Sequence, residues 1–127
     1  MDSVLREAVE PVLRDLARTG MDPPRFDDDD WIGDREYVSA MMWSVDGSGS
    51  GLSVQRAASL EDRIAQAADQ VQEWAIEDQL WGSGRSTNWP PCPNHPETHP
   101  LQANVVGSKP MWVCPADLSV VAPIGER

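Results

Sequence analysis

Residues 89–101 read Trp89-Pro-Pro-Cys-Pro-Asn-His-Pro-Glu-Thr-His-Pro-Leu101, and this stretch holds three of the chain's four Cys and His residues. The chain has two cysteines and two histidines, and all four lie within the 23 residues that end at Cys114. Their spacing is C-x2-H-x3-H-x14-C. Scattered at random, four residues would cluster this tightly on the order of a few per cent of the time, so the spacing indicates a shared purpose.

The chemistry of these four side chains favours zinc. Two thiolates and two neutral imidazoles form the tetrahedral N2S2 shell that structural zinc sites use. We therefore expect a structural Zn²⁺ ion held by Cys92, His95, His99 and Cys114. Asp117 is an alternative to His99 as the fourth ligand, although imidazole is the commoner partner of thiolate.

The sequence around the four residues predicts a loop followed by a small β-sheet. The prolines of residues 89–101 forbid a regular helix there and stiffen the loop. Residues 101–106 and 111–114 flank the turn 107–110, which predicts a hairpin that returns Cys114 to the loop. Trp112 lies on the same strand face as Cys114, where it could cover the metal. A third strand is expected near Val120, Val121 and Ile124.

Residues 89–124 resemble a zinc ribbon, in which a metal ion pins knuckles at the base of a small β-sheet. The resemblance implies a structural zinc ion. The sequence departs from the zinc-ribbon pattern in two ways. His99 is an additional residue in the first knuckle, and Asp117 occupies the position where the second knuckle would have its fourth ligand. The whole chain is also similar to small acidic proteins of high-GC bacteria that end in such a knuckle, a resemblance that implies no activity.

Three other interpretations of the four residues remain open. Cys92 and Cys114 could form a disulfide, or the four residues could share no role. The third interpretation is a zinc enzyme, because His95-Pro-Glu97 matches the H-x-E fragment of zinc deaminases. Pro96 and Pro100 prevent the helix that presents this fragment, and no H-E-x-x-H pattern is present. We therefore expect no enzymatic activity.

The first two thirds of the chain predict a mixed helix and strand unit. Residues 2–18 predict an amphipathic helix, in which Pro11 is expected to produce a kink or two short helices. Residues 21–34 predict a solvated acidic loop around Asp27 to Asp30. The apolar stripe of the first helix is Leu5, Val9, Val12, Leu13 and Leu16.

A hairpin and a long helix should follow. Residues 36–45 and 52–55 alternate as strands around a flexible Gly-rich tip. A capping box at Ser59 predicts a helix that ends at Gly82, with Trp74 and Trp81 buried on one stripe. The expected fold is therefore α+β, with one part over 1–82 and a zinc-ribbon-like module over 83–127. Residues 1–81 have their own apolar stripes and are expected to survive chelation.

The net charge of the chain argues against some classes of partner. The chain has 21 acids against 10 bases, a net charge of −11, which repels nucleic acids and anionic membranes. No run of 18 apolar residues occurs and the first residues are acidic, so we expect a cytoplasmic protein.

The chain's six tryptophans are suited to anchoring a protein interface. We therefore expect a protein-binding adaptor or regulatory subunit, with a basic partner among the candidates. The alternative is an acidic inhibitor of a basic partner, such as an immunity protein, an antitoxin or a nucleic-acid mimic.

Overall fold

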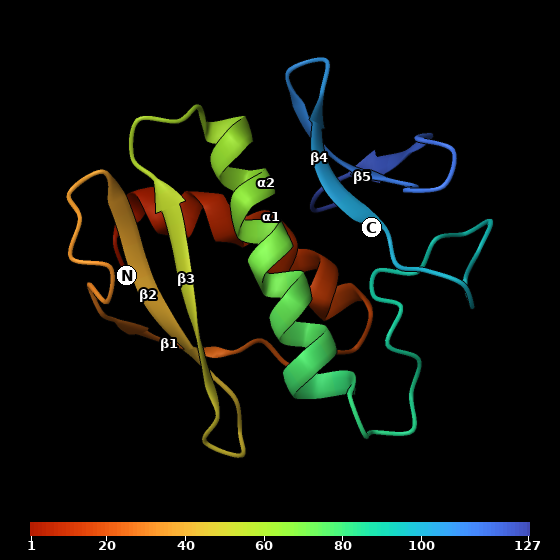
Figure 1. The fold of residues 1–127 in the computed structure, drawn as a ribbon, viewed down its shortest axis with the longest axis horizontal. Coiled ribbons are helices and arrows are strands. Elements are labelled where there is room, and N and C mark those ends of the chain that lie inside the picture. Colours follow the sequence, from red (N-terminus) through yellow and green to blue (C-terminus); the bar gives the residue numbers. More distant parts are fainter.

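The computed structural model describes residues 1–127 and has an α+β fold with two α-helices and two three-stranded antiparallel sheets. In Figure 1, helix α2 runs between the two sheets, and α1 crosses it. The first sheet has the order β1-β2-β3 and the second β4-β5-β6. The helices are α1 (Ser3–Arg18) and α2 (Leu60–Trp74), which continues as the π-helix η1 (Ala75–Leu80). The strands are β1 (Arg25–Asp28), β2 (Tyr37–Trp43), β3 (Gly49–Gln55), β4 (Gln102–Val106), β5 (Lys109–Val113) and β6 (Val120–Pro123).

Helix α1 is a single helix, so of the two predicted effects of Pro11, a kink or a division into two short helices, the division is wrong. The Asp2 carboxylate caps the first turn by accepting the Val4 N–H at 2.8 Å. At the other end Gly20 adopts φ +74°, which lets the next N–H reach back to the Leu16 carbonyl. Pro11 lacks one backbone donor, but both caps and the buried apolar stripe hold the helix together.

Strand β1 lies inside the segment that the sequence predicted to be an acidic loop, so this prediction is wrong for four of its residues. Phe26 packs against the core while its neighbours Arg25 and Asp27 form an ion pair at 2.9 Å. Asp27 and Asp28 lie opposite Met41 and Ala40 of β2. Pairing with β2 and the packing of Phe26 together hold this charged segment at the edge of the sheet.

The hairpin of β2 and β3 is confirmed, but its tip is shorter than predicted. Strand β3 already begins at Gly49. A Cβ at Gly49 would lie 2.6 Å from the Trp43 ring, and one at Gly51 would lie 2.5 Å from the Trp31 ring. These glycines are therefore strand positions that leave room for two indole rings, rather than a flexible loop.

Helix α2 begins as predicted, but its end differs. Ser59 accepts the Asp62 N–H at 3.1 Å, as the capping box requires. From Ala75 onward the helix widens into a π-helix, and the Trp81 N–H bonds to the Ile76 carbonyl. The wider turn breaks the apolar stripe, so Trp74 is buried whereas Trp81 is 78% exposed. The prediction that both tryptophans are core residues is therefore wrong for Trp81.

Two glutamines of α2 occupy the free edge of β3. The Gln70 side-chain amide accepts the Ser53 N–H at 2.8 Å and donates to the Ser53 carbonyl at 2.7 Å. Gln66 accepts the Gln55 N–H at 3.0 Å. The N–H and carbonyl of Ser53 and the N–H of Gln55 thus have partners without a fourth strand.

The second sheet packs on α2, and its predicted hairpin and third strand are both present. One hydrophobic core includes residues from both sides of residue 82. It joins α1, α2 and the first sheet to a group of residues near the C-terminus, namely Trp89, Cys92, Leu101, Trp112, Cys114 and Ile124. The two parts of the chain therefore share one interior.

Candidate metal centre

A short loop, residues 90–100, carries three of the four Cys and His residues, and we call it the proline loop. The Leu101 N–H bonds to the Pro90 carbonyl at 2.8 Å, and Pro91 and Pro100 form an isolated β-bridge. These contacts close the loop at its base. Backbone contacts alone thus hold the two ends of the loop next to each other.

Successive turns inside the proline loop bring its side chains together. The His95 N–H bonds to the Cys92 carbonyl at 3.1 Å. The His95 carbonyl in turn accepts the N–H groups of Thr98 and His99. Cys92, His95 and His99 are therefore each about one turn apart, although the prolines prevent a regular helix.

The second sheet supplies the fourth residue. Cys114 follows directly after β5, and its N–H bonds to the Ser119 carbonyl at 2.9 Å. Its own carbonyl accepts the Leu118 N–H at 2.9 Å. This tight turn fixes Cys114 against the proline loop.

The predicted side chains converge in one place, which we call the Cys/His cluster: Cys92, His95, His99 and Cys114. One ligand atom from each lies within 4.8 Å of all the others. The His95 Nδ1 atom lies 3.5 Å from Cys92 Sγ and 3.6 Å from Cys114 Sγ, and His99 Nε2 lies 3.9 Å from Cys114 Sγ. Both cysteines are buried and free, so they form no disulfide. The cluster could hold one metal ion.

A hydrogen bond selects the neutral tautomer of one histidine of the cluster, and burial affects one of its thiols. His99 Nδ1 lies 3.0 Å from the Pro100 carbonyl. A carbonyl only accepts, so Nδ1 donates, and in the neutral ring Nε2 directs its lone pair toward Cys114. Burial raises the pKa of the Cys114 thiol above its usual value. A metal ion bound there would have to displace that thiol proton.

Two other residues considered in the sequence lie outside the Cys/His cluster. The Asp117 carboxylate accepts the Ser119 hydroxyl at 2.7 Å and the Ser119 N–H at 2.9 Å. These two hydrogen bonds lower the pKa of Asp117 to about 2. The structure therefore brings His99, and not Asp117, to the other three residues. Glu97 is exposed on the proline loop and is not among the four.

The surroundings of the Cys/His cluster are anchored to α1 by residues that the sequence analysis missed. The Trp112 indole N–H donates to the Asp15 carboxylate at 2.8 Å, and the Trp89 indole N–H donates to the Thr19 hydroxyl at 2.9 Å. Asp15 also accepts the backbone N–H groups of Gly125 at 2.8 Å and Arg127 at 2.7 Å. Asp15 is fully buried, so one carboxylate connects α1 to both β5 and the C-terminal residues.

Helix α2 holds the base of the proline loop through Gln72. Its side-chain amide donates to the Trp89 carbonyl at 3.0 Å and also to the Leu101 carbonyl. Spacing in the sequence could have revealed this residue, because Ala68, Gln72 and Ala75 are four and three residues apart on a buried face. Asp15 likewise lies three residues after Val12 on the apolar face of α1.

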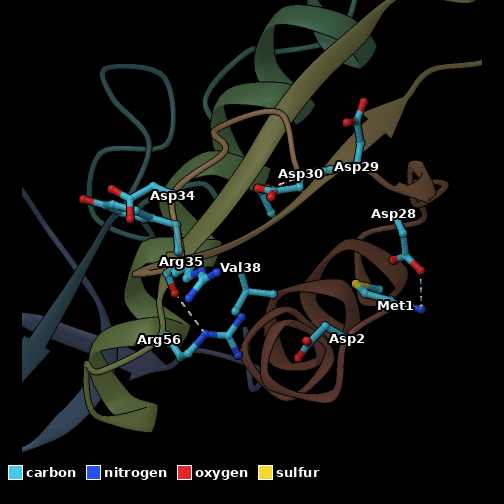
Figure 2. Close-up of a pocket in the computed structure, with 11 residues that line it drawn as sticks. Met1, Asp2, Asp28, Asp29, Asp30, Asp34, Arg35, Val38 and Arg56 are labelled. Carbon is cyan, nitrogen blue, oxygen red and sulfur yellow. Dashed lines mark hydrogen bonds and ion pairs between the residues drawn. The ribbon is translucent and has the colours of Figure 1, made fainter.

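An open hollow at the other end of the molecule gathers acidic side chains. Its volume is about 910 Å³, and Figure 2 shows it between the start of α1 and the loop after β1. Arg35 and Arg56 share this hollow, so it is not uniformly acidic. The aspartates that line it are Asp2, Asp28, Asp29, Asp30 and Asp34.

No protein-family model, no curated protein and no solved structure matches this chain. None of the helices combines the length and the apolar character needed to cross a membrane.

Proposed function

We propose that the Cys/His cluster is a structural zinc site and that the protein is a non-enzymatic, zinc-stabilised protein-binding module. The distances inside the cluster carry the first half of this proposal. Zn–S bonds of about 2.3 Å and Zn–N bonds of about 2.0–2.1 Å at tetrahedral angles place N and S atoms about 3.6 Å apart. The three N···S distances, 3.5, 3.6 and 3.9 Å, are close to this value.

The donor set supports a structural rather than a catalytic role for the metal. Four protein ligands complete a tetrahedral shell, whereas a catalytic zinc ion keeps one position for water or substrate. A zinc hydrolase or deaminase also needs a general base beside the metal. Glu97, which the H-x-E pattern would make that base, lies on the exposed side of the proline loop. The role proposed for zinc is to join the proline loop to β5, in the manner of a zinc ribbon.

Native mass spectrometry tests the metal directly. We expect the purified protein to carry one zinc ion, which is lost on acid denaturation, because the four ligands come together only in the folded chain. Cys92→Ser should carry none. Glu97→Gln is the matched control and should keep the zinc ion, since Glu97 is exposed and lies outside the Cys/His cluster. Full occupancy of Cys92→Ser would contradict the proposed site.

The exposed surface supports the second half of the proposal. Trp81 is 78% exposed and Trp31 is 47% exposed, and aromatic side chains are frequent anchors in protein interfaces. A groove of about 590 Å³ between α2 and the proline loop has carboxylates on one wall and Ile76, Pro100 and Leu101 among its apolar residues. None of its carboxylates, Asp69, Glu73 and Glu77, forms an ion pair. These features suit a basic partner segment with an apolar side chain.

The free thiols support the proposed compartment, and the acidic surface supports the proposed class of partner. Buried, unbonded cysteines are typical of proteins kept in a reducing compartment, which agrees with the proposed cytoplasmic location. The net charge of −11 argues against nucleic acids and anionic membranes as partners. The alternative function, an acidic inhibitor of a basic partner, is favoured by the hollow in Figure 2, where five aspartates gather.

A single capture experiment separates the two functions. Zinc-loaded protein is used as bait in extracts of its native cell, together with two variants. In the adaptor function, Trp81→Ser is expected to lose the partner, because an interface anchor contributes 2 kcal/mol or more, roughly thirtyfold in affinity. Its stability should be unchanged, because Trp81 is exposed.

The second variant replaces Asp28, Asp29 and Asp30 by asparagine. In the inhibitor function, this variant loses the partner and wild-type binding weakens steeply with salt, while Trp81→Ser binds normally. Recovery of the same partner by all three proteins would contradict both functions as stated.

A further inference from the structure

We infer that Gln72 is a positioning residue of the metal centre, which holds the proline loop in its binding geometry before the metal arrives. This inference rests on the proposed zinc site. Gln72 makes no hydrogen bond to the Cys/His cluster. It acts on the two ends of the loop that carries three of the four ligands.

The hydrogen bonds of Gln72 explain how it acts. Its amide nitrogen donates to the carbonyls of Trp89 and Leu101, the residues immediately before and after the proline loop. One rigid amide group on α2 thereby fixes both ends of the loop relative to each other. The Leu101 N–H completes the closure by bonding to the Pro90 carbonyl.

Burial makes these hydrogen bonds strong determinants of the loop position. Gln72 is 8% exposed, so water cannot readily replace its donors. A buried carbonyl that loses its donor carries a desolvation penalty, which favours rearrangement of the loop ends. Fixing the ends lowers the conformational entropy that the loop loses on metal binding. Residues that orient metal ligands from outside the first shell typically change metal affinity 10–100-fold when mutated.

The same helix offers a matched control in Gln70. Gln70 also makes two hydrogen bonds to the backbone of another element, but its partner is Ser53 of β3. Methionine is close to glutamine in length and volume and donates no hydrogen bond. Gln72→Met and Gln70→Met therefore remove comparable interactions from α2, only one of which reaches the proline loop.

The experiment measures zinc affinity by competition with a chromophoric chelator, and the visible absorption of Co²⁺ bound in place of zinc. Gln72→Met is expected to bind zinc about tenfold more weakly than wild type, with altered Co²⁺ bands. Gln70→Met should match wild type in both readouts.

Each other outcome has a defined meaning. Equal zinc affinity of Gln72→Met and wild type would overturn the inference and leave the proposed site intact. Absence of zinc binding by wild type would overturn the proposed site, and the inference with it. Hydrogen exchange on zinc-free wild type tests the same idea without a variant: the Leu101 amide should exchange slowly, and exchange at the rate of an unfolded peptide would overturn the inference.

Discussion

Asp15→Ala is expected to lower the free energy of unfolding by about 3–5 kcal/mol, measured by urea denaturation. The wild-type carboxylate is fully buried and accepts hydrogen bonds from the Trp112 indole and from the backbone N–H groups of Gly125 and Arg127. Alanine leaves all three donors without this partner, and two of them, the Trp112 indole N–H and the Gly125 N–H, lie in the interior. Each buried donor that loses its acceptor costs about 1–3 kcal/mol, and hydrogen bonds to a charged group are stronger than those between neutral groups.

Two further variants test this explanation. Asp15→Asn keeps one oxygen acceptor and is expected to destabilise less than alanine. Glu10→Ala removes a carboxylate from the exposed side of the same helix and should change stability by less than about 0.5 kcal/mol. A loss below about 1 kcal/mol for Asp15→Ala would show that the C-terminal residues contribute little to the folded state.

Chelation of zinc is expected to lower the melting temperature of the whole chain by about 15 °C. Free zinc at a thousand times its dissociation constant stabilises the native state by about 4 kcal/mol. For a chain of 127 residues, 1 kcal/mol corresponds to roughly 4 °C. The apolar stripes of residues 1–81 predict that this part survives chelation. The shared core instead favours one common transition, because Trp89, Cys92 and Trp112 pack in the same interior as α1 and α2.

Differential scanning calorimetry with and without a chelator measures this effect. Cys114→Ser should melt at the lower temperature under both conditions, whereas Glu97→Gln, which changes an exposed residue outside the Cys/His cluster, should respond to zinc like wild type. A melting temperature that is insensitive to zinc would contradict the metal centre. Two separated transitions would contradict the coupling of the two parts.

Much of the candidate site could be predicted from the sequence, because its signal is local. Three of its residues occupy eight consecutive positions, and a short hairpin returns Cys114 to them. The sequence could not decide between His99 and Asp117, since that choice depends on the turn after β5. There Asp117 is already bonded to Ser119, and His99 faces Cys114.

The errors in the fold prediction have a common physical cause, which is tertiary contact that overrides local composition. The acidic segment forms β1 because Phe26 reaches the core. Gly49 and Gly51 are strand residues because indole rings lie over them. Trp81 leaves the buried stripe because the helix changes its pitch at Ala75. In each case the deciding partner is distant in sequence or depends on a backbone geometry that periodicity does not report.

The glutamines at the edge of the first sheet affect how copies of this protein can associate. An unpaired strand border is the usual starting point for edge-to-edge self-association. On one border Gln66 and Gln70 already bond to backbone groups of Ser53 and Gln55 in β3, and on the other border β1 presents Asp27 and Asp28 to any approaching chain. Strand addition from a second copy is therefore disfavoured on both sides of the first sheet.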